Sequence, residues 1–256
     1  CRFCQNWHMS KARLVEQGSV SASPEAIVDL AVREGCPSIA MTYNDPTIFG
    51  EYVIDVSREA RHRGIKSVLV TAGYITPEAR REVYQYIDAV NVDLKAFSET
   101  FYHKITFSHL EPVLDTLRWI KQETDIWCEI TNLIIPGEND SWEETQRLCA
   151  WVAEHMGPNV PLHFTAFHPD FKMQDKTRTP PETLYRARRL AMAEGLNYVY
   201  VGNIHDVSGQ STYCPSCQKA LIVRDWHQVT QQLVVADAHG EGRCPECSTV
   251  IAGVFR

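Results

Sequence analysis

The sequence lacks an excess of positive charge, and this restricts the partners that it can have. Lysine and arginine together number 25, against 32 aspartate and glutamate residues, and the formal net charge is −7 at pH 7. No long basic run interrupts this acidic balance. A surface for nucleic acid would need clustered positive charge, so we expect no nucleic acid among the partners.

Long apolar runs are also absent. A helix that crosses a membrane needs about 18 or more mostly apolar residues, and no run in the 256 residues reaches this length. No signal peptide is visible, and the sequence opens on Cys1 instead of methionine. We expect no membrane partner, a cytoplasmic location, and a sequence that is a fragment of a longer protein.

What the sequence does contain is a regular alternation of strand and helix patterns. Short runs rich in β-branched and aromatic residues predict strands, and apolar residues at helical spacing predict the helices between them. The predicted strands cover residues 38–41, 66–71, 89–94, 126–135, 162–167 and 198–201. The main predicted helices begin near Pro24, Thr47, Thr76, Pro112, Ser141 and Pro180.

Polar residues follow the ends of nearly all the predicted strands. They are Thr42, Asn44, Asp45, Thr71, Asp93, Lys95, Asn132, Thr165, His168 and Asn203. Parallel βα units form either an open sheet or a barrel. In a barrel all strand ends converge on one mouth, whereas an open sheet collects ligands where its strand order reverses. We therefore predict an α/β fold with a full or partial parallel βα barrel of the TIM type.

The composition changes near Ser211, where cysteine pairs and short apolar runs replace the βα alternation. Cys214 and Cys217 form one CxxC pair, and Cys244 and Cys247 form a second. Four thiolates make a closed tetrahedral site, which suits structural zinc or a single iron. Disulfides are the alternative, but paired CxxC spacing without a signal peptide favours a metal.

We therefore expect two domains, a barrel over residues 1–210 and a four-cysteine module, resembling a zinc ribbon or rubredoxin, over residues 211–256. A segment as short as the second needs a staple to hold a core. Cysteine knuckles favour glycine after the second cysteine, where the backbone turns left-handed. Gln218 and Ser248 occupy these two places, at a cost of about 1–2 kcal/mol each if they adopt that conformation.

The first four residues carry another cysteine pair. Cys1 and Cys4 stand three positions apart, with Phe3 just before the second, like the last two cysteines of a CxxxCxxC iron–sulfur motif. The first cysteine of that motif would precede Cys1, where this sequence has no residue. Incidental thiols and one half of a zinc site are the alternatives. In a βα barrel this loop would lie at the mouth, and three thiolates would leave one iron open to a co-substrate.

Residues 1–7 resemble the end of the radical S-adenosylmethionine (radical SAM) motif. Four later stretches occur in the order seen in activating-enzyme-like members, at residues 42–46, 93–95, 135–137 and 167–169. The sequence is most similar to the AmmeMemoRadiSam system radical SAM enzymes, which are like pyruvate formate-lyase activating enzyme. The similarity covers nearly the whole chain, including residues 198–203 and the cysteine-rich tail.

The resemblance implies a role for each residue that matches the family. Cys1 and Cys4 would ligate a [4Fe–4S] cluster, and Phe3 would shield it. Thr42, Asn44 and Asp45 would contact the amino group of SAM. Asp93 and Lys95 would lie near its ribose and carboxylate, and His168 would lie at the mouth of the barrel. Chemically, an ammonium group needs carboxylate or carbonyl acceptors, and a carboxylate is matched by lysine. An ordinary solvated charge pair is the alternative for Asp93 and Lys95, and a packed histidine for His168.

The sequence also departs from the family pattern. Cys1 and Cys4 supply two thiolates instead of three, so we expect the sequence as written to be inactive. Asp45 stands where the family usually has glutamate, and its side chain is shorter by one methylene. Ala72 stands where asparagine is usual, which removes a polar contact.

The implied function is that of an oxidoreductase that reductively cleaves SAM through a [4Fe–4S] cluster and abstracts hydrogen with a 5′-deoxyadenosyl radical. By analogy alone, a protein glycyl residue is one candidate substrate. The family implies an electron donor such as flavodoxin or ferredoxin, together with Memo-like and AMMECR-like protein partners.

Two other functions are weighed against this one. The first is a non-catalytic barrel that binds a partner through its zinc ribbon. The second is a zinc-dependent hydrolase, which would need histidines and carboxylates clustered around a vacant metal position. His103, His109 and His205 show no such spacing, which disfavours the hydrolase.

Overall fold

The computed structural model describes residues 1–11 and 20–255 of the chain. The chain forms two compact units. The first, unit 1, comprises Cys1–Leu94, Tyr102–Cys128 and Pro169–Asp175. The second, unit 2, comprises Lys95–Phe101, Glu129–His168 and Lys176–Arg256.

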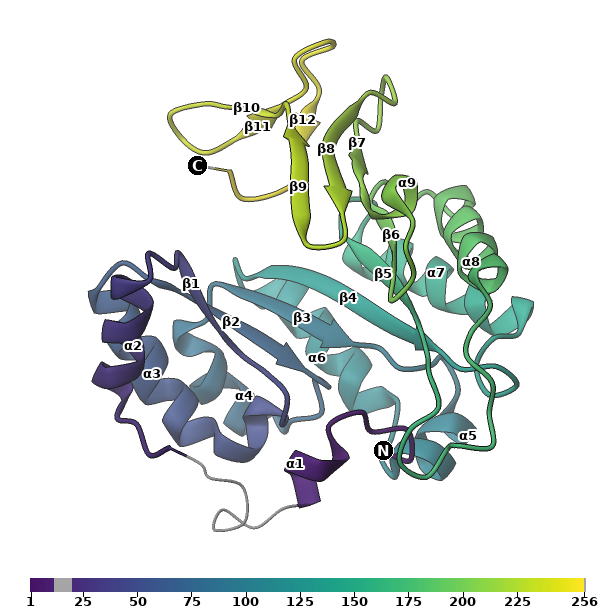
Figure 1. The fold of residues 1–256 in the computed structure, drawn as a ribbon, viewed down its shortest axis with the longest axis horizontal. Helices are drawn as coiled ribbons and strands as arrows, with labels where there is room; N and C mark the ends of the chain where they lie inside the picture. The colour runs from purple at the N-terminus through teal and green to yellow at the C-terminus, as the bar shows by residue number, and fades with distance from the viewer. Residues whose placement is uncertain (12–19, 256) are drawn as a thin grey trace. The chain divides into compact units, whose positions relative to one another are not determined.

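Unit 1 contains three parallel strands with helices between them (Figure 1). The strands are β1 (Ser38–Met41), β2 (Lys66–Thr71) and β3 (Ala89–Asp93). They pair in sequence order, with Ser38 opposite Lys66 and Val68 opposite Ala89. The helices and short turns are α1 (Trp7–Lys11), α2 (Pro24–Arg33), η2 (Pro46–Phe49), α3 (Gly50–His62), α4 (Pro77–Val83), η3 (Tyr84–Tyr86), η4 (Tyr102–Thr106) and α6 (Glu111–Glu123).

Capping groups explain where two of these helices begin. The Ser23 side chain accepts a hydrogen bond from the backbone N–H of Ala26, and Pro24 occupies the first turn of α2. Thr76 caps α4 in the same way, with Pro77 in its first turn. A side-chain oxygen at the cap satisfies an otherwise unpaired backbone N–H, and proline is compatible with the first helical position. The helix starts predicted near Pro24 and Thr76 are therefore confirmed.

Unit 2 repeats the pattern with three further parallel strands. They are β4 (Trp127–Ile134), whose residues from Glu129 onward belong to this unit, β5 (Leu162–Ala166) and β6 (Val199–Gly202). Ile130 lies opposite Leu162, and Leu162 lies opposite Val199. The helices of this unit are α5 (Glu99–Phe101), α7 (Trp142–Met156), α8 (Pro181–Ala193) and α9 (Val207–Gln210).

Burial alternates along the strands, so the two faces of each sheet differ. In β5, Leu162 and Phe164 are almost fully buried, while His163 and Thr165 between them are half-buried. The same alternation occurs in β2, β3 and β6. Successive side chains of a strand point to opposite faces. One face therefore carries the core, and the more open face carries most of the polar side chains.

After β6 the chain forms two small antiparallel sheets. The first pairs β7 (Thr212–Tyr213), β8 (Ala220–Asp225) and β9 (Gln228–Gln232), and the second pairs β10 (Val235–Ala236), β11 (Gly242–Arg243) and β12 (Val250–Ile251). Figure 1 shows these strands in green to yellow near the C-terminus. The apolar runs of the tail thus contribute to β8, β10 and β12.

The observed elements confirm the predicted α/β class of parallel βα units with a four-cysteine tail. Among the described residues there are six parallel strands, β1 to β6. The helix predicted from Thr47 differs, because Asp45 caps the short 3₁₀ turn η2 before α3 begins at Gly50. The turns α5 and η4 were not predicted, since their residues show no apolar repeat. Among the described helices, none combines the length and apolar character needed to cross a membrane.

Candidate functional site

The loop of Cys1 and Cys4 is held in place by segments that are distant in sequence. The backbone N–H of Arg2 donates to the carbonyl of Ile105 at 2.9 Å, and the N–H of Lys172 donates to the carbonyl of Arg2 at 3.0 Å. Phe3 is 4% exposed, Cys4 is half-buried and Cys1 is exposed. The aromatic side chain thus anchors the loop, while the thiols lie toward its surface.

One side chain in this loop has an unsatisfied polar group. The Nε2 atom of Gln5, the residue after Cys4, is shielded from solvent and finds no hydrogen-bond acceptor among the described residues. A buried donor without an acceptor costs about 1–3 kcal/mol, and such groups mark places where a ligand or water supplies the partner. A sulfur-rich cluster next to Cys4 would supply such an acceptor.

Helix α1 extends the loop and is braced by the segment after β5. The ring of Trp7 stacks on Phe171 with centroids 5.6 Å apart, and Trp7 Nε1 donates to Asp170 Oδ1 at 3.1 Å. Asn6 Nδ2 reaches the carbonyl of Tyr43 at 3.4 Å. Tyr43 has a φ of 73°, which is strained for a bulky residue. The contact from Asn6 brings the cysteine loop to the segment that follows β1.

That segment is organised by the Asp45 carboxylate. Asp45 Oδ1 accepts from the backbone N–H of Thr47 at 2.9 Å, and Oδ2 accepts from the backbone N–H of Ala72 at 2.7 Å. The Thr71 hydroxyl lies 3.1 and 3.2 Å from the two oxygens. The side chain therefore ties the loop after β1 to the loop after β2. A carboxylate has about four lone-pair sites, so capacity remains for a further donor.

These contacts join the two residues, Asp45 and Ala72, at which the sequence differs from the pattern that it resembles. Asp45 and Ala72 touch one another directly, because the Ala72 N–H donates to Asp45 Oδ2. The Asp45 carboxylate, one methylene shorter than that of glutamate, therefore holds the backbone at Ala72 in place.

The charge of Asp45 also acts on Tyr84. Burial raises the pKa of the Tyr84 hydroxyl, and the negative charge of Asp45 raises it further.

Gly73 shapes the loop that follows β2. Its φ is 65°, and a Cβ at this position would lie 2.9 Å from Val92 Cγ1. Its N–H donates to the Thr71 hydroxyl at 3.1 Å. Both the left-handed backbone and the close approach of β3 favour glycine here, and they fix the polar groups of Thr71 near Asp45.

The other predicted site residues are divided between the two units. Thr42 is half-buried and Asn44 exposed, both directly after β1, and Asp93 is half-buried as the last residue of β3 in unit 1. Lys95 and His168 belong to unit 2. The Lys95 carbonyl accepts from Asn139 Nδ2 at 2.7 Å, and His168 is exposed shortly after β5.

Four polar side chains of unit 2 form a cluster that the sequence analysis did not predict. His163 Nε2 and Glu129 Oε2 are 2.7 Å apart, and the His163 ring stacks on Tyr200 with centroids 5.0 Å apart. The Tyr200 hydroxyl lies 2.9 Å from the Thr212 hydroxyl. These side chains come from β4, β5, β6 and β7, so only the strand register could have revealed the group.

The four cysteines of the tail converge on one point. Their Sγ atoms all lie within 4.8 Å of one another, with Cys214 and Cys247 at 3.5 Å and Cys217 and Cys244 at 3.7 Å. A tetrahedral ion with metal–sulfur bonds of about 2.3 Å would place its sulfurs about 3.8 Å apart. A disulfide needs about 2.05 Å, so the arrangement fits a metal centre.

The two knuckles have nearly identical backbones. The N–H of Cys214 donates to Lys219 O and the N–H of Gln218 to Cys214 O, and Cys244 and Ser248 make the equivalent bonds. Gln218 and Ser248 have φ values of 60° and 61°. The predicted left-handed conformation at both positions is therefore confirmed.

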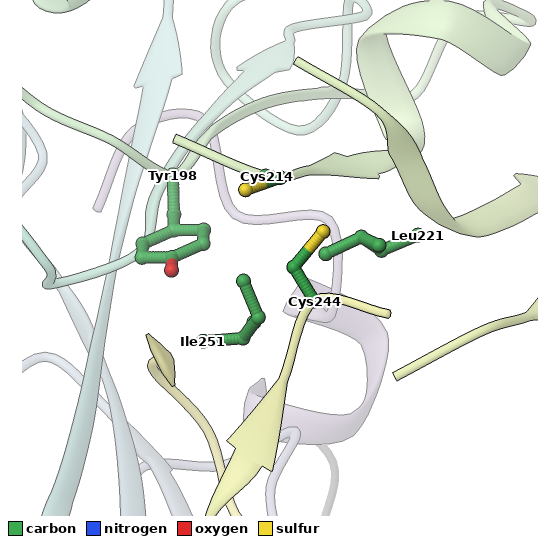
Figure 2. Packing of buried hydrophobic residues seen from close by; sticks show 5 residues of the cluster. All are labelled: Tyr198, Cys214, Leu221, Cys244 and Ile251. Atoms are coloured by element: carbon green, nitrogen blue, oxygen red, sulfur yellow. The ribbon is translucent and has the colours of Figure 1, made fainter. Parts of the chain in front are cut away.

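The metal centre is continuous with a small core. Cys214 and Cys244 are buried with Tyr198, Leu221 and Ile251, and Figure 2 shows these five side chains together. The Tyr198 hydroxyl accepts from the backbone N–H of Ala252 at 3.1 Å. This core thus includes Tyr198, just before β6, as well as residues of the tail.

Hydrogen bonding also favours a thiolate at Cys247, one of the two exposed ligands of this centre, while the pKa of the other, Cys217, is raised. The hydroxyl and then the backbone N–H of Thr249 lower the pKa of Cys247 to about 6. The Cys247 Sγ and Thr249 Oγ1 atoms are 3.2 Å apart. A thiolate is the form that ligates a metal.

Sequence comparison defines the class of the protein. A family model of the radical SAM superfamily matches residues 1–149, which is more than half of the chain. The chain therefore belongs to the radical SAM superfamily. Membership implies a [4Fe–4S] cluster and SAM as cofactors. The match covers Cys1, Cys4, the loops after β1 and β2, and all of β3.

Among curated proteins, the chain is similar to uncharacterized protein MJ0808 of Methanocaldococcus jannaschii. The two are 42% identical over 224 residues, which is 88% of this chain. The aligned part spans 66% of that protein, just under two thirds of its length.

Solved structures share the fold at low sequence identity. A domain of pyruvate-formate lyase-activating enzyme from Bacteroides vulgatus is 18% identical with a TM-score of 0.56, and the match covers 64% of this chain and 98% of that one. A radical SAM methyltransferase from Sphaerobacter thermophilus is 16% identical with a TM-score of 0.61, covering 79% and 62%. SuiB from Streptococcus suis, solved with its precursor peptide SuiA, is 12% identical with a TM-score of 0.58, covering 88% and 53%.

Proposed function

We propose that this protein is an enzyme that cleaves SAM reductively and uses the resulting 5′-deoxyadenosyl radical to abstract hydrogen from a substrate. The observation that carries the proposal is the junction of the Cys1–Cys4 loop with the segment after β1. Asn6 makes this junction by its contact with Tyr43 O, and both segments lie within the part of the chain that matches the radical SAM superfamily.

The residues of the loop provide two of the three thiolates with which the radical SAM motif holds a [4Fe–4S] cluster. Cys1 and Cys4 provide thiolates, which are the ligands such clusters use. Gln5 Nε2 provides a buried N–H that lacks an acceptor among the described residues, and hydrogen bonds to cluster sulfurs tune the reduction potential. When bound, the cluster supplies the single electron that cleaves SAM into methionine and the radical.

The residues around the strand ends suit the co-substrate. Asp45 retains acceptor capacity for an ammonium group, and Thr42 and Asn44 add polar groups beside it. Asp93 and Lys95 are assigned to the ribose and carboxylate of SAM, and His168 to the mouth of the barrel. These assignments rest on charge matching and on the family resemblance.

The substrate is proposed to be a peptide or protein, with a glycyl residue as the candidate position. The proposal is supported by SuiB, a structural neighbour of this chain that binds its precursor peptide SuiA. Flavodoxin or ferredoxin as electron donor, Memo-like and AMMECR-like partners, and a cytoplasmic location remain parts of the same proposal.

The four-cysteine centre is assigned a structural role with zinc or a single iron, in a module over residues 211–256. All four coordination positions are filled by thiolates, so no open position is left for a substrate. A second candidate function, partner binding by this module without catalysis, is favoured by its exposed apolar side chains. Trp226, Val229 and Val235 are 50%, 58% and 59% exposed.

The decisive experiment is anaerobic reconstitution of the full-length protein with iron and sulfide. After reduction with dithionite, the protein is expected to convert SAM into equal amounts of 5′-deoxyadenosine and methionine, measured by mass spectrometry. A reconstituted, reduced protein that releases no 5′-deoxyadenosine would show that the radical assignment is wrong and would leave partner binding as the function.

A further inference from the structure

Two of the three segments at the cysteine loop carry basic residues and no acidic ones, whereas the third, residues 169–175, carries Lys172 together with Asp170 and Asp175. Residues 1–11 contain Arg2 and Lys11 and no acidic residue, and residues 102–110 contain Lys104 and no acidic residue. His8, His103 and His109 add three titratable bases. In a chain with a net charge of −7, this distribution sets the loop apart.

Backbone hydrogen bonds bring the segments that carry Arg2, Lys104 and Lys172 together. Arg2 donates its backbone N–H to Ile105, the neighbour of Lys104, and accepts one from the N–H of Lys172. Arg2, Lys104 and Lys172 are all exposed. Within the described residues, none of the three forms an ion pair with a carboxylate. We call these three residues the basic rim of the cysteine loop.

An exposed aromatic side chain stands beside the basic rim. Phe107 is 72% exposed and has a φ of 60°, which is unfavourable for a bulky residue. The turn is fixed by the Thr106 hydroxyl, which donates to Tyr102 O at 2.7 Å, and by the Ser108 N–H, which donates to Tyr102 O at 3.1 Å. The strained backbone therefore presents an apolar side chain to solvent, as interface anchors are presented.

The proposed reaction needs one electron from outside for every SAM that is cleaved. The donor is oxidised by one electron, and this electron enters the carbon–sulfur bond of SAM as that bond breaks. Electron transfer requires close approach, so a protein donor has to dock beside the loop that carries Cys1 and Cys4. Complementary charge accelerates such encounters between proteins.

We propose that the basic rim and Phe107 form the docking surface for a small acidic electron-transfer protein. The inference rests on the proposed function, and it adds the place and the chemistry of the donor contact. Arg2, Lys104 and Lys172 attract the acidic donor, and Phe107 inserts into an apolar patch near its redox group.

The test compares two reductants for the reconstituted full-length protein. One is an acidic flavodoxin kept reduced by its reductase, and the other is photoreduced deazaflavin, a small donor without a docking surface. The variants are Lys104→Glu, Lys172→Glu and Phe107→Ala. The matched control is Lys121→Glu, because Lys121 is exposed on α6 and lies outside the rim.

The rim variants are expected to lower flavodoxin-driven formation of 5′-deoxyadenosine about tenfold at low salt. The defect should shrink as salt rises, because screening weakens surface attraction. Phe107→Ala should lower the same rate without this salt dependence. Deazaflavin-driven rates and the Lys121→Glu control should stay at the wild-type level.

Other outcomes separate the possible failures. If flavodoxin-driven rates of the rim variants equal that of Lys121→Glu, the docking surface is wrong. If both reductants slow equally, the rim acts on the cluster instead, and the docking proposal is again overturned. If wild-type protein releases no 5′-deoxyadenosine with deazaflavin, the proposed function fails. In that case calorimetry tests the docking surface independently of activity, because Lys104→Glu should still weaken the binding of flavodoxin.

Discussion

The four-cysteine centre and the Cys1–Cys4 loop are assembled in different ways. In the four-cysteine centre, each knuckle makes its own backbone hydrogen bonds within six residues of sequence, and the two knuckles repeat one geometry. The Cys1–Cys4 loop depends instead on Ile105 and Lys172, which are far away in sequence.

This difference separates a site specified locally from one specified by the fold. A closed tetrahedral centre needs only four thiolates at fixed distances, and local turns can provide them. A site that binds a cluster and a co-substrate needs an open position and several converging groups, so it uses the ends of distant elements. Substitutions at the two sites should therefore differ in their effect on stability and metal binding.

Replacing a buried ligand of the four-cysteine centre should have the largest effect. Cys244 is 1% exposed within the core around Tyr198 and Ile251. Structural zinc contributes about 10–16 kcal/mol to the folding of small zinc domains, so Cys244→Ser should unfold β7–β12. Limited proteolysis and metal analysis measure this loss. The control is Cys36→Ser, because Cys36 is exposed and belongs to neither group of proposed metal ligands; this variant should retain the metal. If Cys244→Ser also retained the metal at wild-type stoichiometry, Cys244 would not be a ligand.

The next largest effect is expected at Asp45. Asp45→Ala leaves the backbone N–H groups of Thr47 and Ala72 without their charged acceptor. Hydrogen bonds to charged groups contribute about 1.5–3 kcal/mol each, and we expect the free energy of unfolding to fall by about 3 kcal/mol. Chemical denaturation measures it. Asp29→Ala, which removes a surface pair with Arg63, should cost less than about 1 kcal/mol; equal costs would show that Asp45 is not a tie between loops.

Gly73 provides a test of the loop after β2. Gly73→Ala adds a Cβ 2.9 Å from Val92 Cγ1 at a φ of 65°, and we expect a loss of about 2 kcal/mol from backbone strain and overpacking. Gly64 is the matched control, since its φ is 70° and a Cβ there meets nothing within 4 Å. Gly64→Ala should cost only about 1 kcal/mol. Equal losses in thermal denaturation would mean that the approach of Val92 is unimportant.

The smallest effect, and the only gain, is expected in the knuckles. Gln218 and Ser248 hold φ values of 60° and 61°, which glycine adopts without strain. Gln218→Gly and Ser248→Gly should each stabilise the module by about 1 kcal/mol, seen as slower release of metal to a chelator. Ser216 lies between the cysteines of its knuckle, outside the residues with positive φ, and Ser216→Gly should give no gain. If Gln218→Gly and Ser248→Gly released the metal faster than the wild type, the backbone at Gln218 and Ser248 would not be strained.

Local chemistry explains which features could be predicted from the sequence. The strands at residues 38–41 and 66–71 match β1 and β2, and Ser141 caps α7 where the start of a helix was predicted. The left-handed turns at Gln218 and Ser248 follow from the spacing of the cysteines. Each of these features depends on neighbours within a few residues.

Long-range contacts explain what was missed. The bond between Asp45 and Ala72 joins residues 27 positions apart, and the Glu129–His163 pair joins residues 34 positions apart. The bracing of Trp7 by Asp170 spans 163 positions. Such contacts depend on strand register and on how loops meet, and no local pattern contains that information. The assigned roles of Thr42, Asn44, Asp93, Lys95 and His168 remain predictions.

The most direct test measures iron and 5′-deoxyadenosine in two matched variants of the full-length protein, Cys4→Ser and Cys217→Ser. The account predicts that Cys4→Ser loses the [4Fe–4S] absorption and all release of 5′-deoxyadenosine while it keeps the metal of the four-cysteine centre. Cys217→Ser should lose that second metal and keep the cluster spectrum. If Cys4→Ser still releases 5′-deoxyadenosine from SAM at the wild-type rate, the account of the cysteine loop is wrong.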